Sequence, residues 1–449
     1  MMTSSVEIFT FGCRLNSYES EVIRKHAQNA QLENAIIINT CAVTKEAERQ
    51  AFQLIRKLIR EKPNASLIIT GCAVQIKKHE FSDLPGVHLV LGNLEKLDPS
   101  IFQKFKEKKE LPDFQKTQVG DIFKAKIPQT PLISTYPGIA RAFVEIQNGC
   151  DHRCTFCTIP FGRGNSRSVP LGEIVRQVHH LIEKGYQEIV LTGVDITSYG
   201  RDLPGTPSLG QALKRLFALS PMLPRLRLSS LDPFAIDEDL YQLFGNEPRL
   251  MPHAHLSVQA GDTLILKRMK RRHIREDVLA ACNRLRSARH TITFGADFIA
   301  GFPTETEDMF ENTLRLVEEC DLTYLHVFPY SIRPNTPAAR MPQVPPPLIK
   351  ERAKQLRDLG NIKHKRYLES LQGNVLDVLV ESKNRGRTEG YASVQIKEDS
   401  APLGSIVQIA LGKLMEGALR LQGDVVSSPL FPHISPLNFA QTQELSNDS

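Results

Sequence analysis

Three short apolar runs near the start of the chain each lead into a cysteine, and this repeat constrains the fold strongly. The cysteines that follow the runs are Cys13, Cys41 and Cys72. Successive cysteines are roughly 30 residues apart, which is the length of one strand and one helix. A helical pattern fills the intervals, most clearly at residues 46–62, where apolar side chains recur in steps of three and four. Consecutive units of this kind predict a parallel α/β sheet.

All three cysteines stand at the carboxyl ends of predicted strands. In a parallel sheet those ends meet along one edge, where ligands bind. We therefore expect Cys13, Cys41 and Cys72 to converge on one site and to hold an iron–sulfur cluster. Two alternatives stay open, because a single cysteine is often a small buried residue and two of them can form a redox disulfide. A further strand at residues 87–91 continues the sheet of a small flavodoxin-like domain, residues 1–97.

A second group of cysteines is contiguous and also follows a strand-like run. Cys150, Cys154 and Cys157 have the spacing Cys-x3-Cys-x2-Cys. Three thiols in one short loop suit a [4Fe-4S] cluster, and three ligands leave one of its four irons open to a non-protein ligand. A structural zinc site needs a fourth ligand, and His152 would crowd its neighbours in that role. A ferredoxin-like carrier would have a fourth cysteine nearby, whereas Cys282 is far along the chain.

Six strand-like runs follow one another across the middle of the chain, with helical patterns between most of them. They cover residues 142–147, 188–192, 225–229, 254–259, 291–299 and 324–328. The alternation predicts a parallel α/β structure. A closed barrel of eight such units takes about 250 residues, so six units over residues 141–345 predict an incomplete barrel. The contiguous cysteines follow its first strand, at the edge where barrel active sites form.

The remaining segments differ in composition. Residues 98–140 contain a short helix near Pro99 and then charged and proline-rich stretches, so we expect an extended linker. Residues 346–425 begin with a long basic helix and continue in short period-two runs, which predict a small antiparallel β-barrel. Residues 426–449 are rich in Pro, Ser, Asn and Gln, and we expect a disordered tail.

Composition narrows the class of protein. Lys and Arg number 56 against 50 Asp and Glu, a mild excess that permits a nucleic-acid partner without requiring one. Eight cysteines in 449 residues are too few for a disulfide scaffold, so their grouping indicates metal binding in a reducing compartment. The chain shows no targeting segment and no apolar run long enough to span a bilayer. We therefore expect a cytoplasmic protein with no membrane partner.

Several strings around these motifs carry a family resemblance. They are Gly149–Cys154, Gly162–Gly164, Arg225–Ser230 and Leu264–His273. Together with the paired domains, they resemble the radical S-adenosylmethionine (SAM) methylthiotransferases, over nearly the whole chain to residue 425. Within that family the chain is most similar to the branch that acts on N6-threonylcarbamoyladenosine (t6A) in tRNA. The resemblance implies a partial (β/α)6 barrel and a C-terminal TRAM domain, an RNA-binding barrel similar to the OB fold; a purely structural barrel is the alternative.

The resemblance also implies the chemistry, the cofactors and the partners. The contiguous cysteines would hold a [4Fe-4S] cluster whose open iron binds SAM, and one electron would cleave SAM to methionine and a 5′-deoxyadenosyl radical. The dispersed cysteines would hold an auxiliary [4Fe-4S] cluster that supplies sulfur. One SAM would methylate that sulfur. A second SAM would yield the radical that lets the sulfur replace hydrogen at C2 of the base. The implied partners are a tRNA anticodon stem-loop, a reducing electron donor and a source of sulfur. No catalytic acid or base is identified.

Polar and glycine positions at other strand ends form the expected SAM site. By resemblance these residues are Gly193, Ser257, Gln259, Asp297 and Gly301. Without the resemblance, an ordinary strand-to-helix turn would explain Gly193 better.

A basic run is the candidate RNA-binding surface. It contains Lys267, Arg268, Lys270, Arg271 and Arg272. Such charges engage the phosphates of an anticodon stem-loop in a salt-dependent way. A solvated surface without a ligand is the alternative.

Two positions depart from the family pattern. Thr304 stands where the family loop commonly has a second glycine, which puts close backbone approach to a ligand there in doubt. Asp195 stands where Asn is frequent. Cys282 and Cys320 fall in helical patterns and are expected to be structural.

Three other functions stay open at this point. Two belong to the sister branches, which modify isopentenyladenosine in tRNA or an aspartate of a ribosomal protein. The third, from another class, is an iron–sulfur protein that binds RNA or carries electrons without turning over SAM. Anaerobic release of 5′-deoxyadenosine on reduction would exclude the third.

Overall fold

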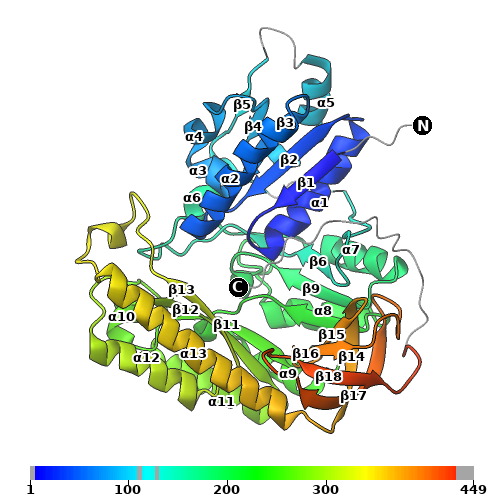
Figure 1. Ribbon diagram of the computed structural model, residues 1–449, viewed down its shortest axis with the longest axis vertical. Helices are drawn as coiled ribbons and strands as arrows, with labels where there is room; N and C mark the ends of the chain where they lie inside the picture. The colour runs from blue at the N-terminus through cyan, green and yellow to red at the C-terminus, as the bar shows by residue number, and fades with distance from the viewer. Residues whose placement is uncertain (1–5, 109–113, 127–130, 431–449) are drawn as a thin grey trace.

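The computed structural model describes residues 6–108, 114–126 and 131–430, which form three bodies (Figure 1). A parallel α/β domain lies at the top of Figure 1, a partial barrel lies below it, and a small β-barrel packs beside the partial barrel. The tail that we expect to be disordered lies, from residue 431 onward, outside the described residues. No helix in the described part of the chain is long and apolar enough to cross a membrane.

Among the described residues, the N-terminal sheet has five parallel strands in sequence order. They are β1 (Val6–Thr10), β2 (Ala35–Thr40), β3 (Ser66–Gly71), β4 (Leu89–Leu91) and β5 (Thr117–Gln118). Helices α1 (Arg14–Asn29), α2 (Lys45–Glu61), α3 (Cys72–Ile76), α4 (Lys78–Ser82) and α5 (Pro99–Lys108) connect and cover them. The predicted parallel α/β class is confirmed. The strand order differs from that of flavodoxin, in which the first two strands are exchanged.

The segment from residue 98 to residue 140 is less extended than we expected. α5 packs Ile101, Phe102 and Phe105 into the same apolar cluster as the strands of the sheet. β5 then pairs with β4 in parallel. The sequence pattern is weak here because lysines surround the three apolar residues of α5 and because β5 is only 2 residues long. The N-terminal sheet therefore extends past residue 97.

Six parallel strands of the described chain follow one another around a partial barrel. They are β6 (Ala142–Glu145), β9 (Glu188–Thr192), β10 (Arg225–Leu228), β11 (His253–Gln259), β12 (Thr293–Ala300) and β13 (Tyr324–Pro329). β10, β9 and β6 form one sheet and β11, β12 and β13 form another. Isolated parallel bridges, Leu226 with Leu250 and Leu231 with Leu256, join the two sheets. In the described residues β6 does not pair with β13, so the barrel is open on one side, as predicted.

Helices cover the outside of the partial barrel. They are α7 (Leu171–Glu183), α8 (Leu209–Leu219), α9 (Glu238–Asn246), α10 (Thr263–Arg268), α11 (Arg275–Ala288) and α12 (Glu307–Glu319). Tyr18 and Val22 of α1 belong to the same apolar cluster as Val144 of β6. The N-terminal domain therefore packs on the barrel through α1, which places Cys13, the cap of that helix, beside the barrel.

The C-terminal barrel follows a long helix, α13 (Pro346–Ser370), which crosses the outside of the partial barrel (Figure 1). The strands β14 (Val375–Ser382), β15 (Arg385–Thr388), β16 (Ser393–Ile396), β17 (Ile406–Leu414) and β18 (Leu421–Val425) close into one barrel. The predicted small β-barrel is confirmed. β15 was not visible in the sequence, because its four residues Arg-Gly-Arg-Thr lack apolar alternation.

Candidate metal centres and active site

The contiguous cysteines lie in the loop between β7 (Gln147–Asn148) and α6 (Ile159–Arg163), after the first barrel strand. The N–H of Cys150 donates to the Gly164 carbonyl at 3.0 Å, and the N–H of Cys157 donates to the Cys154 carbonyl at 3.1 Å. Burial raises the pKa of Cys150 to about 12, and the neighbouring Asp195 and the two other thiols add to the increase. The three cysteines fall within residues 150–157, so one short loop carries all three sulfurs.

The dispersed cysteines meet at the carboxyl edge of the N-terminal sheet. Cys13 caps α1, Cys41 follows β2 and Cys72 begins α3. Burial raises the pKa of Cys41 to about 12, and the other two thiols raise it further. Gly12 makes room for this arrangement, because it has a φ of +94° and an added Cβ would lie 2.5 Å from the Cys41 sulfur. Three thiols that are far apart in sequence thus share one site.

The donor atoms of both groups fit iron–sulfur clusters. Sets made only of thiols favour iron–sulfur clusters or soft metals, and a closed zinc site would need a fourth ligand. At the contiguous site the ligand atoms of His152 and Asp195 lie with that of Cys150 within 4.8 Å of one another. His152 Nε2 and Asp195 Oδ2, however, already engage each other at 2.9 Å. Each group therefore supplies three free thiols, which suits a cluster with one iron left open.

Asp195, one of the two departures from the family pattern, has hydrogen-bond partners for both its carboxylate and its backbone N–H. Its carboxylate accepts hydrogen bonds from Thr197 Oγ1 at 2.6 Å and from Ser198 Oγ at 2.5 Å, and its N–H donates to Gln147 Oε1. Burial alone would raise the pKa of Asp195, but the bonds from His152 and the two hydroxyls hold it below its usual value. The departure therefore places an ionised carboxylate beside the contiguous cysteines.

The two cysteine groups meet where α6 packs against α3. α6 begins soon after Cys157, and a Cβ added to its Gly162 would lie 3.3 Å from the Cβ of Cys72. Asn93 connects the same two elements, because its Nδ2 lies 2.6 Å from the Gly162 carbonyl oxygen and 3.5 Å from the Cys72 sulfur. The helix that follows the contiguous cysteines thus lies directly against Cys72 of the dispersed group.

A buried charge network holds this contact together. Arg163, at the end of α6, donates to both carboxylate oxygens of Glu19 at 2.8 and 2.9 Å and to Asn16 Oδ1 at 2.5 Å. Lys96 Nζ donates to Glu19 at 2.7 Å. Burial alone would raise the pKa of Glu19, but Arg163 and Lys96 lower it to about 2. The network fixes α1 of the N-terminal domain against the loop that follows the contiguous cysteines.

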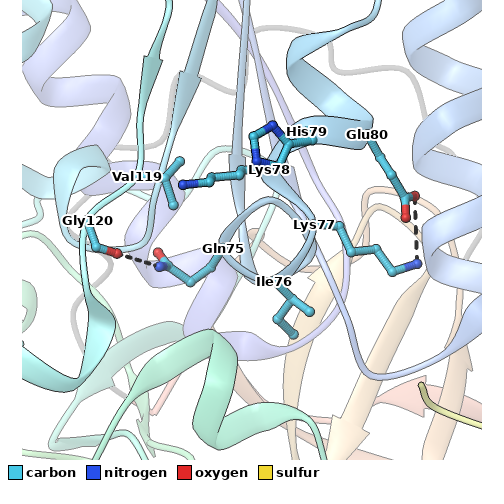
Figure 2. Close-up of a pocket in the computed structure, with 8 residues that line it drawn as sticks. All are labelled: Gln75, Ile76, Lys77, Lys78, His79, Glu80, Val119 and Gly120. Atoms are coloured by element: carbon cyan, nitrogen blue, oxygen red, sulfur yellow. Dashed lines mark hydrogen bonds and ion pairs between the residues drawn. The ribbon is translucent and has the colours of Figure 1, made fainter. Parts of the chain in front are cut away.

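A second charged link joins the same two domains. Arg333, in the segment after β13, donates to Glu48 Oε1 of α2 at 2.8 Å, and Lys77 donates to Glu48 Oε2 at 2.9 Å. Lys77 also lies 3.8 Å from Glu80, at a hollow of about 400 Å³ on the N-terminal domain (Figure 2). That hollow is lined by residues 75–80, Val119 and Gly120 and includes no cysteine, so it is separate from the candidate metal centres.

The inside of the partial barrel is polar, unlike the aliphatic layers that fill a closed barrel. Arg227 of β10 donates to both carboxylate oxygens of the buried Glu188 of β9, at 2.9 and 3.2 Å. Asp297 of β12 lies 3.0 Å from His255 Nε2 of β11 and 3.3 Å from His326 Nδ1 of β13. We call this group of five polar residues inside the partial barrel the polar lumen.

A turn of the C-terminal barrel closes one end of the polar lumen. This turn, residues 389–391, lies between β15 and β16. The carbonyl of Gly390 accepts hydrogen bonds from Thr293 Oγ1 and from Tyr324 Oη, both at 3.0 Å. Those partners stand at the amino-terminal ends of β12 and β13, opposite the cysteine loop. The C-terminal barrel therefore packs against the amino-terminal end of the partial barrel.

Two of the five residues expected at a SAM site, Ser257 and Asp297, are linked to the cysteine loop or to the polar lumen. Ser257 lies two residues after His255 on β11, and its carbonyl accepts from Arg271, an arginine that also reaches the cysteine loop. Gln259 follows a β-bulge and has a φ of +71°. Asp297 is held by two histidines of the lumen. These positions stay a prediction for SAM contact.

The two glycines expected at the SAM site are accounted for by packing. A Cβ on Gly193 would lie 2.7 Å from the carbonyl oxygen of Gln147. Gly301 has a φ of +73°, and a Cβ there would lie 2.6 Å from Ile349 of α13. Both positions require glycine whether or not SAM touches them.

The five cations expected to bind RNA do not form one surface. Lys267 and Lys270 are exposed. Arg271, with a side chain only 9% exposed, lies 3.7 Å from the Cys154 sulfur and pairs with Asp232 at 3.3 Å. Arg272 pairs with Asp232 at 3.4 Å. Both arginines point towards the cysteine loop, so the RNA-binding prediction is restricted to the exposed lysines.

Arg268 is hydrogen-bonded to Thr304, the second departure from the family pattern. Its Nη1 donates to the hydroxyl and the carbonyl of Thr304 at 2.8 and 3.1 Å. Thr304 has a φ of +69°, a conformation that favours glycine. Thr304 therefore adopts a backbone conformation that favours glycine, and its side chain fixes an arginine in place.

Several functional residues were not found by the sequence reasoning. The Arg163–Glu19 network joins residues 144 positions apart, and no local pattern announces such a pair. Arg163 lies in one of the strings that carry the resemblance, which was a usable signal. Tyr391 comes from the C-terminal barrel, and only the fold brings it to the polar lumen.

Comparison with known proteins covers most of the chain. Residues 144–317 match the family model described as the Radical SAM superfamily, and residues 5–92 match Uncharacterized protein family UPF0004. The Threonylcarbamoyladenosine tRNA methylthiotransferase MtaB of Rickettsia prowazekii (strain Madrid E) is 49% identical over 92% of this chain and 96% of that protein. The tRNA-2-methylthio-N(6)-dimethylallyladenosine synthase of Shouchella clausii (strain KSM-K16) is 32% identical over 94% and 84%.

A solved structure shares the fold. The radical S-adenosylmethionine methyltransferase TsrM from Kitasatospora setae, with cobalamin and a [4Fe-4S] cluster bound, aligns with a TM-score of 0.55 over 75% of this chain and 74% of that one. The sequences are 13% identical, so this likeness concerns the fold alone.

Proposed function

Because this chain belongs to the radical SAM methylthiotransferases, and within them to the threonylcarbamoyladenosine tRNA methylthiotransferases, we propose that it methylthiolates C2 of t6A at position 37 of tRNA. The product is 2-methylthio-t6A, next to the anticodon. The observation that carries the proposal is the pair of three-cysteine groups that meet where the N-terminal domain packs on the partial barrel.

The chemistry requires such a pair. C2 of an adenine carries no acidic proton, so a base alone cannot activate it. When bound, two [4Fe-4S] clusters and SAM supply the radical and the sulfur that this substitution needs. We assign the SAM cluster to Cys150, Cys154 and Cys157, and the auxiliary cluster to Cys13, Cys41 and Cys72.

The protein's own residues bind, orient and shield the reactants. The Arg163–Glu19 network keeps the two cysteine groups at a fixed separation, which a reaction between them needs. Arg271 and Arg272 place two positive charges beside the contiguous cysteines, and Asp232 holds both side chains in position. Burial alone would raise the pKa of Asp232, but His273 and the two arginines lower it well below its usual range.

The partners follow from the same reaction. Lys267 and Lys270, together with the C-terminal barrel, would hold an anticodon stem-loop through its phosphates. Each turnover consumes electrons and sulfur, so the protein also needs a reducing electron donor and a source that restores the sulfur. These partners work in the cytoplasm, where thiols stay reduced.

The test is a nucleoside analysis of tRNA from cells with and without the gene. Mass spectrometry should show that 2-methylthio-t6A disappears with the gene and that the wild-type gene restores it. Genes carrying Cys13→Ala or Cys150→Ala should fail to restore it. Persistence of 2-methylthio-t6A in the cells without the gene would contradict the proposal.

Isopentenyladenosine at position 37 is the second candidate substrate, favoured by the similarity to a dimethylallyladenosine synthase. The same analysis separates the two. Loss of the methylthio group from the isopentenyl nucleoside alone would keep the reaction class and replace the substrate.

A further inference from the structure

One arginine of the N-terminal domain reaches into the partial barrel. Arg14 follows Cys13 directly, at the first position of α1. Its Nη2 lies 3.2 Å from the hydroxyl oxygen of Tyr391, in the turn that closes the polar lumen. A side chain that is adjacent to a candidate cluster ligand therefore contributes to the wall of the lumen.

Arg14 belongs to a group of four arginines around Tyr391. Arg141 lies 3.3 Å from the Tyr391 hydroxyl oxygen. The guanidinium carbons of Arg141, Arg227 and Arg387 lie 5.0, 4.9 and 4.6 Å from the centre of its ring. Four positive charges gathered around one side chain need compensation by negative charge.

Two carboxylates compensate three of these arginines. Glu188 pairs with Arg141 at 2.6 Å and with Arg227 at 2.9 Å. Glu381 pairs with Arg141 and, at 3.2 Å, with Arg387. No carboxylate of the described residues pairs with Arg14. Even with the tyrosine ionised, four cations would face three anions, so the group keeps an uncompensated positive charge.

The proposed substrate carries the matching negative charge. The threonyl part of t6A ends in a carboxylate, whereas the isopentenyl group is neutral and apolar. C2 is one of the two ring atoms that flank N1, and N6 is attached to the other, so a base that presents C2 to the dispersed cysteines holds its N6 substituent close to them. An arginine next to Cys13 is therefore within one side-chain length of the substituent. The carboxylate of SAM has its own place at the open iron of the other cluster.

We propose that Arg14 binds the carboxylate of the threonylcarbamoyl group and selects this base over neutral N6 substituents. The inference rests on the proposed function and names the residue that sets its substrate. A planar guanidinium binds a carboxylate through two parallel hydrogen bonds, and this gives orientation as well as affinity. Tyr391 positions the guanidinium before the substrate arrives.

The experiment compares two anticodon stem-loops that differ in one group. One carries t6A and the other carries its neutral threonine amide, which has nearly the same size. Wild-type enzyme should lose about 10- to 100-fold in kcat/KM on the amide, the range for one hydrogen bond to a charged group. Arg14→Gln should lose as much on t6A and should no longer distinguish the two stem-loops, while Arg14→Lys should keep part of the preference. Arg24→Gln, the same change at a half-buried position of α1 where the arginine pairs with Glu21 at 3.0 Å, should keep the wild-type preference.

A binding measurement removes the clusters from the comparison. Fluorescence anisotropy of both stem-loops on the apo chain should show the same loss of preference in Arg14→Gln, and iron analysis of the reconstituted enzyme checks that the auxiliary site still fills. Retained preference for t6A in Arg14→Gln would overturn the inference alone. If Arg14→Gln weakened the binding of both stem-loops equally and kept the preference for t6A, Arg14 would contact the RNA backbone instead, and the inference would be overturned as well. Wild-type enzyme that modifies only an isopentenyl stem-loop would overturn the proposed function, and the inference with it.

Discussion

Each of the two cysteine groups offers three thiols, but the two groups are built in different ways. The contiguous group is one loop, folded by backbone hydrogen bonds among Cys150, Cys154 and Cys157 and the turn at Gly164. The dispersed group is assembled by three strands of a parallel sheet. Its members are far apart in sequence and come together only when that sheet forms. A local motif can therefore be recognised without a fold, whereas the second site is a property of the fold.

The difference also predicts different sensitivities. Changes in the sheet or in the contact between domains should damage the dispersed site first, because nothing else holds its cysteines together. The contiguous site should tolerate such changes, since its loop is short and carries its own backbone bonds.

The largest expected effect comes from removing one cysteine of each group. Cys150→Ala should abolish both SAM cleavage and methylthiolation, because the ligand set for the radical-generating cluster is incomplete. Cys13→Ala should abolish methylthiolation and leave reductive release of 5′-deoxyadenosine. Anaerobic assays that quantify both products make the comparison. Loss of 5′-deoxyadenosine in Cys13→Ala with normal iron at the other site would show that the two sites are not separable in this way.

Glu19→Gln tests the contact between the two domains. It leaves Arg163 and Lys96 buried without their carboxylate and should cost about 3–5 kcal/mol of stability at pH 7. The pKa of Glu19 is lowered to about 2, so its contribution is complete above its ordinary pKa near 4.5 and is lost as the pH falls towards 2. Denaturant unfolding of apo protein between pH 2 and 7 should show this fall in wild type and a smaller one in the variant.

Glu188→Gln is the matched control for that variant. Glu188 is also fully buried, also has its pKa lowered to about 2, and lies at the far end of the barrel from the cysteine loop. It should reproduce the loss of stability and leave both sites able to bind iron, whereas Glu19→Gln should weaken the dispersed site. Equal iron binding by the two variants would contradict the role of the contact.

Gly12→Ala tests the packing around the cysteines of the dispersed site. A Cβ there would lie 2.5 Å from the Cys41 sulfur, and a φ of +94° is strained for alanine. We expect a loss of about 2 kcal/mol and loss of iron at this site alone. Gly172→Ala, on α7 with open space around it, is the control and should stabilise by up to about 1 kcal/mol. Unchanged iron in Gly12→Ala would show that the site adapts more readily than the structure indicates.

The smallest effect is expected at Thr304. Thr304→Gly relieves the strain of a positive φ and loses the bond to Arg268, so the two changes should nearly cancel, within about 1 kcal/mol. Thermal unfolding measures the net stability, and SAM cleavage shows whether the freed arginine matters. A large loss of SAM cleavage would assign Arg268 a direct role near the contiguous site.

The sequence predicted most of the architecture because the signals were periodic. The six barrel strands and the cysteine loop follow from local patterns, and the dispersed cysteines follow from the rule that parallel strands end at one edge. What could not be predicted depends on contacts between distant segments. Arg271 looked like one of five equivalent surface cations, and only the fold turns it towards Cys154. No local pattern in the sequence distinguishes Arg14, and only the fold places Tyr391 of the C-terminal barrel opposite it.

Iron and sulfide analysis of the anaerobically reconstituted protein tests the central claim most directly. The wild-type chain should bind about eight irons, and replacing all three cysteines of either group by alanine should leave about four. Mössbauer spectra of the two triple variants should each show a [4Fe-4S] cluster. A wild-type chain with about four irons, or a variant of the dispersed group that still binds about eight, would contradict the assignment of two three-cysteine cluster sites.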